Sequence, residues 1–262
     1  DLLATNVNKD DGHFYYNTYF KLDDDIAYDY DTAWDSDADY TSNFTPIGTN
    51  NTYFRGHFDG NGKTISGIRV YAPTTNDIAI FRTIDSQAEV KGITLDDTRL
   101  TGQNVVAGIV ARTGTNNGTG TVTGCTVTNR VAIHITATNG SNYGGIVAVN
   151  NHGTVSHCVS SIQMTIADGV TPRYFGGIVG NNSDALTDNF VIGALIPEAR
   201  NSAHAAIAVN AYNTNSYSYA HNYYRNCTVA GTANATGVGV CTMVNETTTT
   251  IADITENNGA VP

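Results

Sequence analysis

Five short apolar segments recur in the same order along the 262-residue chain. They place one isoleucine column in register, formed by Ile80, Ile109, Ile146, Ile178 and Ile207. A unit of about 30 residues cannot bury its apolar face alone, but stacked copies can bury a continuous core. The recurrence therefore predicts a parallel β-helix in which each strand pairs with its equivalent in the next coil.

A second recurrence, typified by "KTISGIRV" and "TVTGCTV", predicts another inward column. Its members are Ile68, Ile93, Cys125, Cys158, Phe190 and Cys227. The segment before Phe190 has one more residue between its apolar positions than the other copies, so we expect a local bulge there. In the first copy, Ile65 can share a face with Ile68 and Val70 only if the chain turns a corner at Gly67.

Composition agrees with an all-β chain, because only 14% of residues are charged. Thr, Asn, Gly and Tyr are abundant, whereas the Leu, Glu and Lys that surface helices favour are scarce. An immunoglobulin-like sandwich would not keep one residue column through the chain, and propeller blades repeat at about 40 residues or more. We expect one all-β domain: a single-stranded parallel β-helix of about six coils with an N-terminal cap.

The expected organisation has three parts. Residues 1–53 form a cap, with a short helix at "LLATNVN" and a first strand within "YFKLDDDI". Residues 54–241 form the coils, which begin at the tight turn "HFDGNG", where Asn61 and Gly62 adopt positive φ at little cost. Residues 242–262 form a terminal coil fragment or second cap.

Several segments resemble the GLUG-motif family of bacterial repeat proteins. They are "YFKLDDDI" at 19–26, "FTPIG" at 44–48, "FRGHFDGNGKTISGIRV" at 54–70 and the "GGIVG"-like segments at 108, 145 and 177. These are secreted or surface proteins of gut Bacteroidetes, related to filamentous adhesins and to repeats of immunoglobulin A peptidases. The resemblance implies a right-handed parallel β-helix, a location in the cell envelope and a role in adhesion or carbohydrate contact.

The net charge of −11 is concentrated near the N-terminus. Residues 1–40 hold 11 acidic residues against Lys9 and Lys21. Such a surface repels phosphate backbones, so we expect no nucleic-acid partner. No apolar run approaches the ~20 residues of a membrane span, so we expect no insertion into a membrane. The chain starts at Asp1 without a signal peptide, and we interpret it as a processed or trimmed protein that is secreted or at the cell surface.

Aromatic residues favour a binding function, because 11 of 15 tyrosines fall in residues 15–40 and 212–224. Rings with polar tips suit stacking on sugars or contact with a protein. The predicted ligand-binding residues are Trp34, Tyr28, Tyr30, Tyr40, Tyr212, Tyr217 and Tyr219. The alternative is that these rings only pack the two ends of the solenoid.

Three carboxylates at alternate positions, Asp35, Asp37 and Asp39, are a candidate structural calcium site. The spacing does not continue into an EF-hand loop, because Tyr40 stands where Gly is required and Pro46 where Glu is required. The alternative is a solvated acidic loop. We expect no other cofactor.

Cysteines and asparagines are assigned structural roles. Cys125, Cys158, Cys227 and Cys241 lack a Cys-x-x-Cys pair, so they are expected as buried small residues rather than zinc ligands. Disulfides between Cys125 and Cys158, or between Cys227 and Cys241, remain open. Asn150, Asn181 or Asn182, and Asn210 follow the isoleucine strands and predict an internal amide ladder at a coil corner.

Catalysis is not expected. Residues 102–180 contain a single acid, Asp168, whereas a polysaccharide hydrolase needs two or three carboxylates on consecutive coils. We therefore predict a non-catalytic module, monomeric as a fragment, that binds an extracellular glycan or host protein. A polysaccharide lyase or hydrolase and a structural spacer remain the alternatives.

Overall fold

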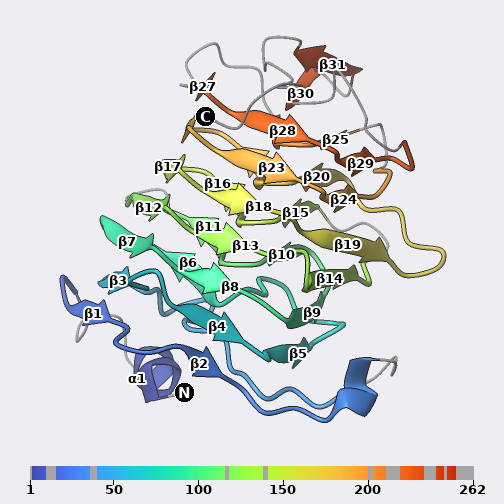
Figure 1. Cartoon of the computed structure of the whole chain (residues 1–262). Helices are drawn as coiled ribbons and strands as arrows, with labels where there is room; N and C mark the ends of the chain where they lie inside the picture. The colour runs from blue at the N-terminus through green and yellow to red at the C-terminus, as the bar shows by residue number, and fades with distance from the viewer. Residues whose placement is uncertain are drawn as a thin grey trace.

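The structure is a computed structural model that describes residues 2–9, 16–35, 40–115, 118–137, 141–199, 203–210, 219–232, 240–244 and 247–251. Successive strands wind into a parallel β-solenoid of about five turns, which confirms the predicted fold class with about one turn fewer than expected. Figure 1 shows the turns stacked in chain order, from α1 at one end to β31 at the other. No described helix is long and apolar enough to cross a membrane.

Five sheets run along the solenoid, and we number them in the order in which one coil passes through them. Sheet 1 consists of β1 (Tyr19–Lys21), β3 (His57–Asp59), β7 (Ala88–Lys91), β12 (Gly120–Thr123), β17 (Gly153–Ser156), β22 (Ala185–Thr187) and β27 (Tyr219–Ala220). Sheet 2 consists of β2 (Ile26–Ala27), β4 (Thr64–Ser66), β8 (Thr94–Leu95), β13 (Thr126–Val127), β18 (Val159–Ser160), β23 (Phe190–Ile192) and β28 (Tyr223–Arg225).

The other three sheets complete each coil. Sheet 3 consists of β5 (Arg69–Tyr71), β9 (Thr98–Gly102), β14 (Val131–Ile135), β19 (Gln163–Ile166), β24 (Leu195–Ile196) and β29 (Thr228–Val229). Sheet 4 consists of β10 (Val105–Ala107), β15 (Asn142–Gly144), β20 (Tyr174–Gly176) and β25 (His204–Ala205). Sheet 5 consists of β6 (Phe81–Ile84), β11 (Val110–Thr113), β16 (Val147–Asn150), β21 (Val179–Asn182), β26 (Ala208–Asn210), β30 (Val240–Val244) and β31 (Thr247–Ile251). The described pairs are parallel, except that β31 runs antiparallel to β30.

The isoleucine column is confirmed by the register of sheet 5. Phe81 pairs with Val110, which pairs with Val147, so the isoleucine before each of them stacks on its equivalent. The five isoleucines are at most 2% exposed and belong to one continuous core. Stacking identical side chains keeps the cross-section of the core constant from coil to coil.

The second predicted column is wrong as drawn, because it merges two real columns. Ile93, Cys125 and Cys158 stack just before the strands of sheet 2, and the next position there is Asn189. Ile68 and Cys227 instead belong to a column before the strands of sheet 3. Phe190 pairs with Val159 and is only half-buried, on the outer side of the sheet.

The predicted bulge before Phe190 is also wrong. Ser156 pairs with Thr187 and Val159 pairs with Phe190, so both corners have the same length. Asn189 occupies the inward position because its amide is fully hydrogen-bonded. It donates to Val155 O at 3.0 Å and to Asn222 Oδ1 at 2.8 Å, and its oxygen accepts from Cys158 N at 3.0 Å.

The corner at Gly67 is confirmed. Its φ of +75° turns the chain between Ile65 and Ile68, and both side chains reach the core. A Cβ at this position would collide with the carbonyl oxygen of Tyr28. The turn after β3 also has the predicted geometry, because Asn61 has φ of 54° and its N–H donates to Asp59 Oδ1 at 2.7 Å.

The N-terminal segment covers the first coil. Helix α1 (Leu2–Lys9) buries Ala4 and Val7 against the core, and Asn8 Nδ2 donates to Pro46 O at 3.0 Å. A short 3₁₀ helix, η1 (Thr32–Asp35), follows β2.

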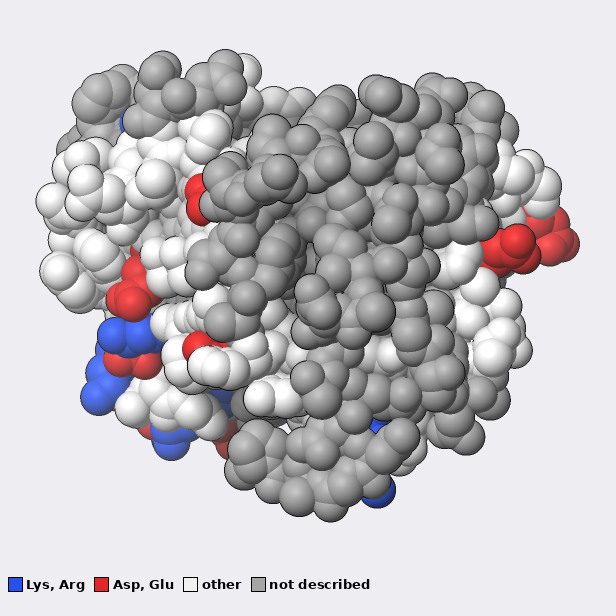
Figure 2. Space-filling model, turned by 90° about the horizontal axis from the view of Figure 1, so that it is seen from above, with Lys and Arg blue, Asp and Glu red and all other residues white. Residues whose placement is uncertain are grey.

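From above, the described surface is largely uncharged, with acidic and basic side chains adjoining at one side (Figure 2).

Candidate functional site

An open depression of about 400 Å³ lies at the corner where the chain passes from sheet 5 to sheet 1. We call it the corner groove. Its described lining residues are Tyr16, Ser86, Gln87, Thr115, Gly118, Thr119 and His152. They come from the N-terminal segment and from three successive coils, so the groove runs along the solenoid rather than within one turn.

The register of sheet 1 stacks three polar side chains of the groove, which we call the polar row: Gln87, Thr119 and His152. Gly120 pairs with Ala88 on one side and with Gly153 on the other, so the preceding residues Gln87, Thr119 and His152 are neighbours. Backbone bonds fix this row, since Gln87 N donates to Thr119 O at 2.8 Å and Gly120 N donates to His152 O at 3.0 Å. The row therefore presents one side chain per coil at nearly constant spacing of about 4.8 Å.

Unusual backbone conformations shape the corner. Ser86 and Gln87 have φ of 56° and 68°, and Ala88 N donates to Asp85 O at 3.1 Å, which together define a tight turn of the primed class. Gly114 has φ of +67°, and a Cβ there would lie 2.5 Å from His152 O. The corner thus needs glycine at this position to let adjacent coils approach.

Beneath the groove, the fold buries a charge. Asp85 is 4% exposed, and its Oδ2 lies 3.9 Å from Arg55 Nη2. Gly118 packs directly on this carboxylate, so a larger side chain there would displace it. Oδ1 of this carboxylate has no hydrogen-bond partner among the described residues, whereas Oδ2 accepts from the Ser86 hydroxyl at 3.5 Å.

An amide ladder supports the same corner from inside and confirms part of the asparagine prediction. Thr113 Oγ1 donates to Asn150 Oδ1 at 2.5 Å, Asn150 Nδ2 donates to Asn182 Oδ1 at 2.7 Å, and Asn182 Nδ2 donates to Asp184 O at 2.7 Å. The ladder uses Asn182 rather than Asn181. Asn210 lies in β26, but its side chain is outside the described residues.

The chemistry of the groove suits a polyhydroxylated ligand. Tyr16 is 52% exposed and offers a ring, while the row of amide, hydroxyl and imidazole groups offers donors and acceptors one coil apart. Glycan sites combine such a flat ring with convergent hydrogen-bonding groups. His152 supplies the one imidazole among the described lining residues.

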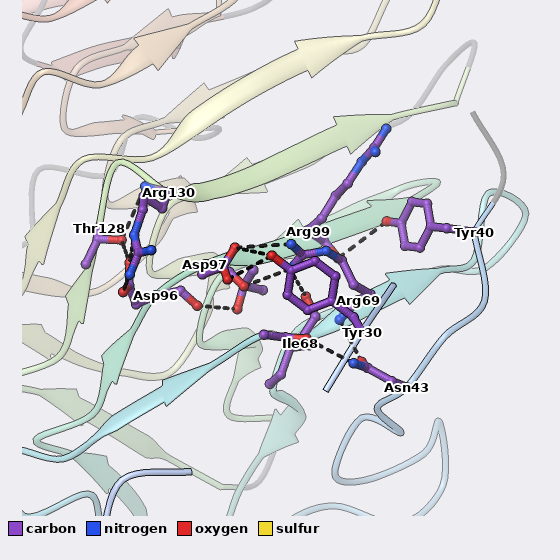
Figure 3. Close-up of polar contacts among 12 residues, drawn as sticks. Tyr30, Tyr40, Asn43, Ile68, Arg69, Asp96, Asp97, Arg99, Thr128 and Arg130 are labelled. Carbon is purple, nitrogen blue, oxygen red and sulfur yellow. Dashed lines mark hydrogen bonds and ion pairs between the residues drawn. The ribbon is translucent and has the colours of Figure 1, made fainter. Parts of the chain in front are cut away.

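The predicted ligand-binding residues Tyr28, Tyr30 and Tyr40 do not line the groove. Figure 3 shows Tyr30 and Tyr40 beside Arg69 and Arg99 of the first coils. Tyr28 is half-buried and packs edge-on against Phe44 at 5.5 Å between ring centroids. Burial raises the pKa of its phenol. Tyr30 lies over Arg69, with 3.5 Å between the ring centroid and Cζ, and its hydroxyl donates to Asp97 Oδ2 at 3.0 Å.

Tyr40 is the most buried of these rings, at 6% exposure. Its hydroxyl lies 2.9 Å from both Val70 O and Thr101 Oγ1, and burial raises the pKa of the phenol. The Arg99 guanidinium lies 4.8 Å from the ring centroid. A ring enclosed in this way offers little surface to a ligand, and in the structure it holds the N-terminal segment on sheet 3.

Other predicted site residues are described in part or not at all. Trp34 and Asp35 lie in η1 and Tyr219 in β27, but their side chains are outside the described residues. Asp37, Asp39, Tyr212 and Tyr217 are wholly outside them. Among the residues that the structure describes, no group of three or more metal-ligating side chains is positioned to hold a metal ion.

The cysteines match the prediction of buried residues. Cys125, Cys158 and Cys227 are buried free thiols, so the two disulfides that the sequence left open do not form. Burial raises the pKa of Cys158 and Cys227, whereas the hydrogen bond from Cys158 lowers the pKa of Cys125. Cys241 lies in β30, and its side chain is outside the described part.

Sequence reasoning missed the groove residues, although two signals could have found them. Tyr16 belongs to the tyrosine-rich segment that favoured binding. Gln87, Thr119 and His152 each precede the small residue that opens a strand of sheet 1, so a column drawn through those positions would have aligned them. Apolar columns alone could not identify the groove residues, because residues that line a groove do not need to resemble one another.

Comparison with known proteins gives one structural likeness to report. No family model matches the chain, and no curated protein matches it. A solved structure from Bacteroides ovatus, described as a "putative immunoglobulin A1 protease", is similar at 15% sequence identity and a TM-score of 0.42. The match covers 92% of this chain and 75% of that chain.

Proposed function

We propose that this chain is a non-catalytic β-solenoid module that binds a glycan in the corner groove. The observation that supports the proposal is the exposed ring of Tyr16 beside a row of hydrogen-bonding side chains on successive coils. A sugar unit spans roughly the spacing of one coil, about 5 Å, so an extended chain of sugars can follow the row. The ring would stack on one face of a sugar while Gln87, Thr119 and His152 bond its hydroxyls.

Location and partner are parts of the same proposal. The resemblance of "FDGNGKTISGI" to GLUG-motif repeats favours a secreted or cell-surface protein that contacts an extracellular glycan or a host protein. The low fraction of charged residues, 14%, agrees with a neutral ligand. The groove needs no cofactor for this task, and calcium at the loop of Asp35, Asp37 and Asp39 would only stiffen the cap.

The test is a glycan array, together with a panel of host-matrix proteins, probed with the whole chain with and without calcium. We expect retention of a glycan that falls about tenfold in Tyr16→Ala and in His152→Ala, equal to a loss of about 1.4 kcal/mol. Tyr19→Ala and His221→Ala are matched controls, because both side chains are exposed and neither lines the groove. Circular dichroism should show an intact fold in all four variants.

A second arm replaces Trp34, Tyr217 and Tyr219 together. If this triple variant loses binding while Tyr16→Ala keeps it, the ligand sits at the tyrosine-rich ends and the groove assignment fails. Glycans shortened or desaturated during incubation would support the polysaccharide lyase or hydrolase alternative. If the folded protein binds nothing on the array or the panel, the result would support the spacer alternative.

A further inference from the structure

The exposed apolar side chains of the described residues gather at the N-terminal end of the solenoid. The large ones are Leu2, Tyr16, Tyr19 and Ile26, and Leu2 and Tyr19 are more than 70% exposed. Tyr19 lies on β1 and Ile26 on β2, while Leu2 begins α1. Isolated exposed apolar residues are ordinary, but their collection at one end points to an interaction surface.

At this end two strand edges have no further strand beside them among the residues that the structure describes. β1 is the terminal strand of sheet 1 and pairs with β3, and β2 is the terminal strand of sheet 2 and pairs with β4. Thr18 O accepts from His57 N at 2.8 Å and Leu22 N donates to Asp59 O at 2.9 Å, so these residues face β3. Because parallel strands alternate, the N–H and C=O groups of Tyr19 and Lys21 point away from β3.

The loop between the two edges is acidic. Asp23, Asp24 and Asp25 lie between β1 and β2 and are exposed, and Asp29 and Asp31 follow β2. Asp25 is anchored, since its Oδ1 accepts from Thr64 N at 2.7 Å. Lys21 is the described basic residue nearest to them in the sequence. The negative electrostatic potential of these aspartates repels a second copy of this chain, whose net charge is −11, and attracts a positively charged partner.

We propose that the N-terminal edge, formed by β1, β2 and the loop of Asp23 to Asp25, docks an extended, basic segment of a partner protein by strand addition. Backbone groups of Tyr19 and Lys21 would pair with the segment, its Lys or Arg side chains would face the aspartates, and its apolar side chains would pack on Tyr19 and Ile26. Main-chain pairing of this kind supplies affinity, and the side chains on alternate positions supply specificity. Tyr16 lines the corner groove and is not part of this edge, so either proposal can fail alone.

The probe is a short synthetic peptide that alternates Lys and Val, titrated into the isotope-labelled whole chain. We expect amide shift changes centred on residues 19–27, with affinity that falls as salt rises. A peptide that alternates Glu and Val should bind at least about tenfold more weakly. Equal binding of the two peptides, or shift changes confined to other parts of the chain, would overturn the proposal.

Two pairs of variants separate charge from strand addition. The double variant Asp23→Lys with Asp24→Lys should weaken binding of the basic peptide at least about tenfold, whereas Asp168→Lys, an exposed site on a distant loop, should not.

The second pair tests strand addition. Lys21→Pro removes an outward N–H without touching the bonds to β3, and Lys21→Gln removes only the positive charge. We expect weaker binding from Lys21→Pro and unchanged or tighter binding from Lys21→Gln. If both variants bind alike while remaining folded, strand addition is excluded.

Discussion

Tyr30 and Arg69 join the N-terminal segment to the first coil, with 3.5 Å between the tyrosine ring centroid and Cζ of the guanidinium. Arg69 is 2% exposed. It donates to Asp97 O at 2.7 Å and Ile68 O at 3.1 Å, and pairs with Asp97 Oδ1 at 3.1 Å. A cation removed from water in this way depends on these partners for its stability.

Replacing Asp97 by Asn should therefore destabilise the protein by about 2 kcal/mol, less than for a fully buried pair because the carboxylate is partly exposed. Urea unfolding measures the loss. The matched control is Asp77→Asn, since Asp77 also has positive φ and pairs with an arginine, Arg112, whose side chain is 35% exposed against 3% for Arg69. That control should lose less than about 1 kcal/mol. Equal losses would refute the importance of burying Arg69.

The buried amide of Asn189 gives a second prediction. Asn189→Ala removes the amide that Cys158 N and Val155 O bind, whereas Asn222 Oδ1 keeps the bond from the backbone N–H of residue 189 at 3.2 Å. The loss should be about 3 kcal/mol by thermal or urea unfolding. Asn181→Ala is the control, because Asn181 Oδ1 has no hydrogen-bond partner among the described residues. The control should change stability by less than about 1 kcal/mol. A smaller loss in Asn189→Ala than in the control would contradict the hydrogen bonds assigned to Asn189.

The carboxylate of Asp96 gives a pH-dependent prediction. Burial alone would raise its pKa, but hydrogen bonds from Arg130 and Thr128 outweigh burial and hold the pKa below the ordinary 3.8. The folded state therefore favours the ionised form, and its stabilising contribution is present above about pH 4 and lost as pH falls through the lowered pKa. The destabilisation caused by Asp96→Asn should be largest near pH 7 and vanish toward pH 2. A loss that is constant with pH would contradict this assignment.

The thiols should be unreactive in the folded protein. Alkylation followed by peptide mapping should leave Cys125, Cys158 and Cys227 unmodified until denaturant is added, because all three are buried and burial raises the pKa of Cys158 and Cys227. Mapping without reductant should find no disulfide between Cys125 and Cys158. Rapid labelling of any of the three in native buffer would show that the coil stack opens locally.

The fold was predictable because every coil must bury an apolar side chain at the same place in its core. Ile80 and its four equivalents occupy the same place in each cross-section, so the sequence repeats what the geometry repeats. The column through Phe190 failed because a buried position can be filled by a satisfied amide as well as by an apolar side chain. Asn189 is such a case, and apolarity alone could not reveal it.

The candidate site was less predictable for a different reason. The tyrosine clusters drew attention to the N-terminal segment, but they could not distinguish Tyr40, which is buried under Arg99, from Tyr16, which is exposed beside the groove. That difference depends on which coil each ring reaches after the chain has folded. Residues of the polar row differ in type, so their proximity follows from strand register rather than from a recognisable motif.

The pairing of Gly120 with Gly153 makes one whole coil an interchangeable unit. A chain that lost or duplicated residues 120–152 would join strands whose neighbours present the same inward positions, so the seam would match. Length can then vary in steps of a single coil without redesign of the core. Evolution or protein engineering could therefore lengthen the groove by one coil at a time and change how many consecutive ligand units the protein binds.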